Sequence, residues 1–122
     1  MQRARRALRP VVRARKLQQL GLRGVTQKDG AELRAHEVCN GKAGSVGYCL
    51  GGKLAYLMAT RSDSDANVGY YGVGLGDLLG EAKNITKPLM LHIAEKDKFS
   101  SAEEIAKVQK GLSANKKVTT HV

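Results

Sequence analysis

The hydrophobic positions of the chain change period several times after about residue 28, and each change marks a new element. From residue 50 onward, Leu50, Leu54 and Leu57 recur at helical spacing, which predicts a helix with one buried side. The segment KPLMLHIA is apolar on both faces, as expected of an interior parallel strand. The pattern predicts strands near 44–48, 67–71, 88–94 and 117–122, and helices near 27–39, 50–61 and 101–112.

This alternation of strands and helices indicates the fold class. Strands that alternate with helices at this spacing form a parallel sheet with right-handed crossovers, so we expect an α/β domain. The segment GLGDLLGEAKN predicts a loop that leads into a weak helix. No internal repeat is visible, and 122 residues are enough for one small domain but not for two.

The predicted helix at 101–112 has clear signals at both ends. Ser101 followed three residues later by Glu104 is the pattern of a capping box. The acidic Glu103 lies in the first turn, whereas Lys107 and Lys110 lie toward the end, which matches the helix dipole. We therefore expect the helix to begin directly after Ser101.

The net charge of +10 would suggest a nucleic-acid partner if it were spread over the domain. Residues 1–28 contain nine Arg or Lys and no acid, whereas the rest contains twelve Arg or Lys against eleven acids. A nearly neutral body offers a polyanion no extended positive surface. We therefore expect no nucleic-acid partner and divide the chain into a basic extension, 1–27, and an α/β domain, 28–122.

The basic extension allows several interpretations. It could be a poorly ordered, solvated segment, an organellar presequence or membrane-surface helix, or a segment that is not native to the domain. Pro10 interrupts a helical pattern, and no apolar run approaches the length that would span a bilayer. Cys39 and Cys49 have neither zinc-site nor disulfide-framework spacing, so we expect no metal and a cytoplasmic protein with free thiols.

Three motifs compete for the glycine-rich stretches. GYCLGGK matches a phosphate loop, but Leu54 follows where a hydroxyl should bind magnesium. YYGVGLG, with Glu95 after the next strand, only loosely resembles a dinucleotide fingerprint because its glycines have the wrong spacing. The third motif is a nucleophile elbow, in which Gly47 and Gly51 flank Cys49 at two residues on each side. We expect no bound cofactor.

The elbow has a mechanical reason for its glycines. A nucleophile at positive φ on a strand-to-helix turn brings the neighbouring backbones together, so both flanking positions should be very small. The helix amino terminus would favour the thiolate of Cys49, and the N–H of Leu50 would donate to an oxyanion. A buried, inert cysteine in a glycine-rich turn remains the alternative.

Three blocks in order, NGKAGSVGYCLGGKLAY, VGYYGVGL and KPLMLHIAEKDKFS, resemble the dienelactone hydrolase (carboxymethylenebutenolidase) family of α/β-hydrolases. The resemblance runs from about residue 28 onward. It implies a partial α/β-hydrolase fold, three-layered around a parallel sheet. It also implies that Cys49 is the nucleophile, Asp97 the triad acid, and Tyr70 and Tyr71 neighbours of the pocket.

The histidines fit the implied triad less well. The fold's chain order is nucleophile, acid, histidine, and only His121 follows Asp97. His121 falls within the last predicted strand, whereas the family's histidine lies in the loop beyond it. His92 and His36 are expected to be structural. The resemblance also implies first strands, a second oxyanion donor and substrate-binding arginines ahead of the elbow, and we expect these to be missing from residues 1–27.

Two functions follow from the resemblance. The first is a hydrolase in which Cys49 attacks the carbonyl carbon of a small lactone or ester, with Asp97 as triad acid. The second is a truncated chain that keeps the elbow without a catalytic histidine and turns over little or no substrate.

Overall fold

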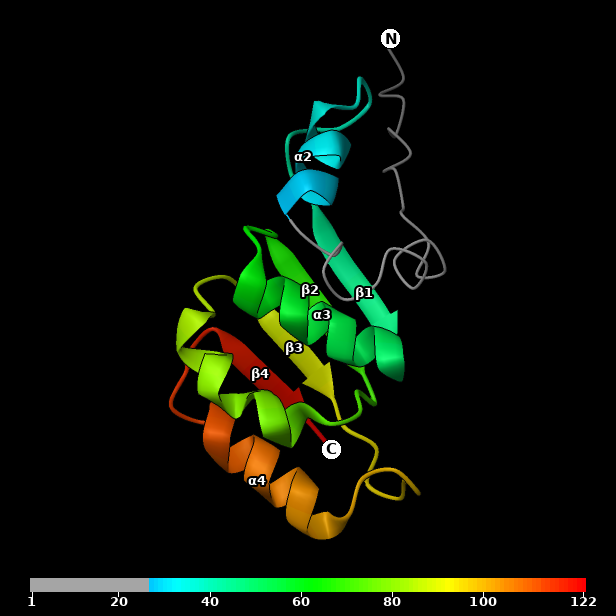
Figure 1. Cartoon of the computed structure of the whole chain (residues 1–122), viewed down its shortest axis with the longest axis vertical. Coiled ribbons are helices and arrows are strands. Elements are labelled where there is room, and N and C mark those ends of the chain that lie inside the picture. The colour runs from blue at the N-terminus through cyan, green and yellow to red at the C-terminus, as the bar shows by residue number, and fades with distance from the viewer. Residues whose placement is uncertain (1–26) are drawn as a thin grey trace, which may run out of the picture.

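The structure, a computed structural model, describes residues 27–122, and the extension 1–27 therefore lies outside the described residues except for Gln27 (Figure 1). The elements in chain order are α2 (Gln27–Ala35), β1 (Gly44–Tyr48), α3 (Leu50–Arg61), β2 (Ala66–Tyr70), the 3-10 helix η1 (Leu75–Asn84), β3 (Leu89–His92), α4 (Ala102–Leu112) and β4 (Val118–His121).

The predicted parallel α/β arrangement is confirmed. The four strands lie in the order β1-β2-β3-β4, and every neighbouring pair is parallel. The carboxyl ends of all strands therefore meet at one edge of the sheet, where open α/β sheets bind their ligands. Cys49 directly follows β1 at this edge, and Asp97 lies in the loop after β3.

Several elements differ from their predicted bounds, β2 and β4 by a single residue at each end. Helix α2 ends at Ala35 and not near residue 39, because the chain continues in tight turns such as the one closed by Cys39 N–H and the carbonyl of His36. Strand β3 is shorter than predicted, although Ile93 N–H still donates to the carbonyl of His121 at 2.7 Å. The weak helix forms as the 3-10 helix η1.

The hydrophobic core lies between the sheet and three helices on one of its faces (Figure 1). Tyr56 of α3, Leu89 and Leu91 of β3, and Leu112 of α4 are almost completely buried. Each buried Leu stabilises the fold by about 1.5–3 kcal/mol relative to exposure. This packing fixes α3, and with it the turn at Cys49, against the sheet. None of the helices within residues 27–122 is long and apolar enough to cross a membrane.

Among residues 27–122, no element covers the opposite face of the sheet. Val46, Tyr48 and Met90 point to this side and are 55%, 57% and 39% exposed. Strand β3 was predicted to be apolar on both faces, yet its side chains alternate between buried and partly exposed. Residues 27–122 therefore form two of the expected three layers, the sheet and the helices α3, η1 and α4.

An ion-pair cluster holds α2 to the amino edge of the sheet. Arg34 donates to the carboxylates of Asp63 (2.7 Å) and Asp65 (3.1 Å). Asp65 also accepts a hydrogen bond from Ala43 N–H at 2.8 Å, and the Nζ of Lys87 lies 3.5 Å from the Asp65 carboxylate. The Ala43 N–H, followed by the Arg34 guanidinium, lowers the pKa of Asp65 to about 2.

The substitution Asp65→Asn should reduce the loss of unfolding free energy that the chain shows as the pH falls below about 4. The carboxyl pKa is about 2 in the folded chain and about 3.9 when unfolded. Its stabilisation is therefore complete above about pH 4 and lost as the pH falls toward 2. At neutral pH we expect the variant to lose about 1–3 kcal/mol in urea unfolding. Asp77→Asn, which removes an exposed acid, is the control. If wild type and D65N lose the same unfolding free energy between pH 4 and 2, the lowered pKa of Asp65 is contradicted.

Candidate active site

Cys49 adopts a backbone conformation that residues with a Cβ rarely occupy. Its φ is 56° and its ψ is −115°. The surrounding hydrogen bonds hold it there, because its N–H donates to the carbonyl of Tyr70 at 2.9 Å and its own carbonyl accepts from Gly52 N–H at 2.9 Å. The cysteine is exposed and not buried. The turn thus has the backbone geometry predicted for a nucleophile elbow.

The two flanking glycines contribute unequally to the elbow. A Cβ built on Gly47 would overlap the carbonyl group of Gly51, so position 47 accepts no side chain. A Cβ on Gly51 would meet nothing within 4 Å. The expectation that both positions must be very small is therefore wrong for Gly51, because the close approach involves its backbone and not the space around its own Cβ.

A second close approach supports the elbow and was missed in the sequence. A Cβ on Gly52 would lie 2.7 Å from the carbonyl oxygen of Tyr70 and 2.8 Å from the Cα of Gly72. The first turn of α3 therefore packs directly on the end of β2. The Gly51-Gly52 pair in the sequence was the available signal, but its partner Gly72 could be found only once the two strands were aligned.

Leu50 is the first residue of α3, so its N–H has no partner within the helix. It follows Cys49 directly at the positive end of the helix dipole. These two features make its N–H suitable for donating to an oxyanion, as the sequence predicted. The position of the donor relative to a bound substrate stays a prediction.

Asp97 lies in the loop between β3 and α4 and is partly exposed. Its carboxylate accepts a hydrogen bond from Phe99 N–H at 3.0 Å, and its backbone forms an isolated bridge with Ser100. Within residues 27–122, no hydrogen bond or ion pair joins Asp97 to Cys49 or to an imidazole. The role of Asp97 as triad acid therefore stays a prediction.

Aromatic rings form a stack across the open face at the carboxyl edge. The stack follows the strand register: the ring centroids are 5.0 Å apart for Tyr48 and Tyr70, 4.6 Å for Tyr70 and His92, and 5.1 Å for His92 and His121. Tyr71 has a positive φ of 38° and tilts against Tyr48 at 6.1 Å. Tyr70 thus packs between neighbours, whereas Tyr71 stays exposed beside the elbow.

The remaining histidine and the acidic groups suggest no further chemistry here. His36 lies in the turn after α2, where its Nδ1 accepts from Val38 N–H at 3.4 Å. No group of three or more His, Cys, Asp or Glu among residues 27–122 is placed to hold a metal ion.

Comparison with known proteins identifies the lineage of this site. The model of the dienelactone hydrolase family matches residues 2–122. The chain belongs to the dienelactone hydrolase family. The match begins within the basic extension, whereas the resemblance seen in the sequence begins near residue 28. Membership agrees with the parallel α/β sheet and with an elbow centred on a cysteine.

Several relatives of the family are similar to this chain. A protein of Azospirillum brasilense is 62% identical over 73 residues, 60% of this chain and 32% of that protein. Carboxymethylenebutenolidase 1 of Cupriavidus pinatubonensis is 40% identical over 72% of this chain and 38% of its own length. The carboxymethylenebutenolidase of Pseudomonas putida is 42% identical over 67% of this chain and 35% of its own length. The chain thus spans about a third of the length of these curated relatives.

The unequal glycines of the elbow predict opposite outcomes for two matched substitutions. Gly47→Ala should lower the free energy of unfolding by about 3 kcal/mol or more, because its methyl group collides with backbone that cannot move. Gly51→Ala should be neutral or stabilising by up to about 1 kcal/mol, because it adds a helix former in open space. Urea unfolding of both variants measures the difference. Equal destabilisation by both would mean that the Gly47–Gly51 contact is not formed.

Proposed function

We propose that this chain carries the nucleophile of a cysteine-dependent hydrolase that acts on a small lactone or ester. The observation that carries the proposal is the exposed Cys49 at positive φ, between a parallel strand and the start of a helix. Family membership and the names of the relatives support the substrate class. No other cysteine of residues 27–122 has this setting, since Cys39 lies in a turn after α2.

The chemistry begins with the thiolate of Cys49. The sulfur attacks the carbonyl carbon, forming a C–S bond, and the electron pair of the carbonyl moves onto its oxygen. The N–H of Leu50 donates to this oxyanion. Collapse of the intermediate breaks the C–O bond and releases the alkoxide, which takes up a proton. Water then attacks the thioester, releases the carboxylic acid and regenerates the thiol.

Asp97 is proposed as the triad acid that orients an imidazole base. Its place in the loop after β3, at the same sheet edge as Cys49, supports this role. Phe99 is 75% exposed, whereas Ile93 and Ser100 are partly buried, so the exposed tip of the loop lies between partly buried ends. Tyr71, exposed beside the elbow, is proposed to line the substrate pocket.

A second candidate function is a chain that is acylated once and then stays acylated. The observation that favours it is the position of His121, whose ring stacks on His92 on the open face. Among residues 27–122, neither ring hydrogen-bonds to Asp97. Without a base beside the sulfur, hydrolysis of the thioester is expected to lag far behind its formation, because losing one triad member costs orders of magnitude in rate.

Acylation with p-nitrophenyl acetate near neutral pH distinguishes these outcomes. We expect about one equivalent of p-nitrophenol per chain, with the acetyl group mapped by mass spectrometry to Cys49 and not to Cys39. Cys49→Ala should abolish the burst, and Cys39→Ala, the matched control, should leave it intact. Preferential acylation of Cys39 would contradict the elbow assignment. Sustained turnover that is lost in His121→Ala would instead make His121 the base.

A further inference from the structure

Two loops leave the carboxyl edge of the sheet next to each other and carry residues of the proposed site. The loop after β2 begins with Tyr71 and leads through Gly72 and Gly74 into η1. The loop after β3 carries Asp97 and ends at Ser101, the N-cap of α4. How these loops are held relative to each other sets where Asp97 lies with respect to Cys49.

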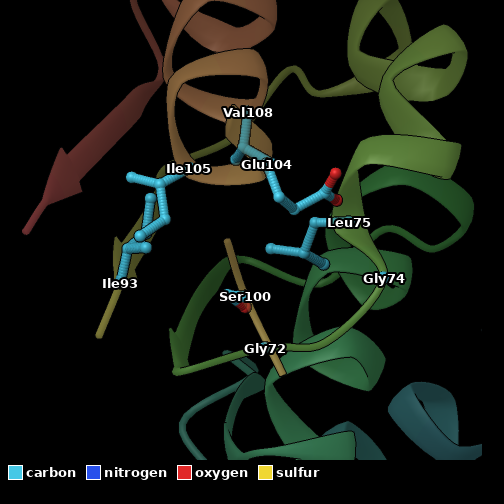
Figure 2. Close-up of a pocket in the computed structure, with 8 residues that line it drawn as sticks. All are labelled: Gly72, Gly74, Leu75, Ile93, Ser100, Glu104, Ile105 and Val108. Carbon is cyan, nitrogen blue, oxygen red and sulfur yellow. The ribbon is translucent and has the colours of Figure 1, made fainter. Parts of the chain in front are cut away.

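Glu104 connects the two segments through its backbone and its side chain. Its N–H donates to the hydroxyl of Ser101 at 3.2 Å, which confirms the predicted cap. Its carboxylate does not complete the capping box at Ser101 but accepts a hydrogen bond from Gly76 N–H at 2.8 Å, in the first turn of η1. Figure 2 shows the side chain extending from α4 toward η1 beside Leu75.

The space around Gly76 is built for this contact. A Cβ on Gly76 would lie 2.7 Å from Oε2 of Glu104, so the glycine allows the carboxylate to approach the backbone. Glu104 is partly buried, and it borders a small, open depression together with Gly72, Gly74 and Ser100 (Figure 2). A hydrogen bond to a charged acceptor in a partly shielded place is stronger than one between neutral groups.

The contacts form a continuous path from the nucleophile to the acid. At one end, the Cys49 N–H donates a hydrogen bond to the carbonyl of Tyr70, the last residue of β2, and Gly52 packs on Gly72. The loop from Gly72 leads to Gly76, which Glu104 holds. At the other end, Ser101 caps the same turn of α4, and the Ser100 N–H donates to the carbonyl of Asp97 at 3.4 Å.

We propose that Glu104 is a positioning residue, which fixes the loop that carries Asp97 relative to Cys49 by holding the start of α4 to the start of η1. The proposal rests on the proposed function for the role of Asp97. At their far ends the same two elements are tied by Asn115, whose side chain donates to the carbonyls of Ala82 and Ile85 at 3.1 Å each. Glu104 therefore controls the end that faces the site.

The test is the spread of distances between the two segments. In a Cys39→Ser, Lys98→Cys background of the full chain, spin labels on Cys49 and at position 98 report this distance by pulsed electron resonance. We expect one narrow distribution, broadened at least twofold by Glu104→Ala. Glu104→Gln, whose amide oxygen can still accept from Gly76 N–H, should restore most of the narrow peak. Glu103→Ala, an exposed acid of the same turn, should change nothing.

Gly76→Ala is the second variant, because it removes the contact from the other side and should broaden the distribution equally. Hydrogen exchange at the Gly76 amide checks the bond itself. Faster Gly76 exchange in E104A with an unchanged distance distribution would mean that Glu104 only caps η1, which overturns the proposal. Unchanged hydrogen exchange of the Gly76 amide in E104A would also overturn the proposal. Failure of the proposed function appears separately, as absence of Cys49 acylation, and leaves the distance measurement intact.

Discussion

The packing of the Gly51 carbonyl group against the Cα of Gly47 is the contact on which the rest of the site depends. It lets β1 turn into α3 within one residue, and that residue is Cys49, held at a φ of 56°. A side chain at position 47 would push the helix away from the strand. The second contact, between Gly52 and Gly72, then locks the helix onto the neighbouring strand. Strain at one residue is thus balanced by packing at four glycines.

The same constraint orders the rest of the carboxyl edge. Because β1 and β2 are in register, the last residue of each strand lies beside the other, and the stack of Tyr48, Tyr70, His92 and His121 continues that register to β4. These rings occupy the open face, whereas the helices cover the other. On the helix-covered side, the Gly76 N–H of η1 donates to Glu104 of α4, the helix that follows the Asp97 loop.

Much of this fold could be predicted from the sequence, because the period of the hydrophobic pattern changes sharply at the elbow. The bounds of β1 and α3 match their predictions, since Cys49 separates alternating from helical spacing. The end of α2 could not be predicted, because it depends on the tight turns that follow Ala35, and the helix is held by ion pairs of Arg34 with Asp63 and Asp65, about thirty residues away. Likewise, no sequence pattern indicates the positive φ of Tyr71 or the hydrogen bond from Gly76 N–H to the Glu104 carboxylate, whose partners are 28 residues apart.

The surroundings of Cys49 hold it in a strained backbone conformation, and comparing Cys49→Gly with Cys49→Ala tests this strain directly. Both variants remove the sulfur, but only glycine adopts this backbone without strain. We expect C49G to be more stable than C49A by about 1–3 kcal/mol in urea unfolding. At a helix start without strain, glycine relieves no backbone strain. A C49G variant that is equally or less stable than C49A would therefore show that Cys49 is not strained.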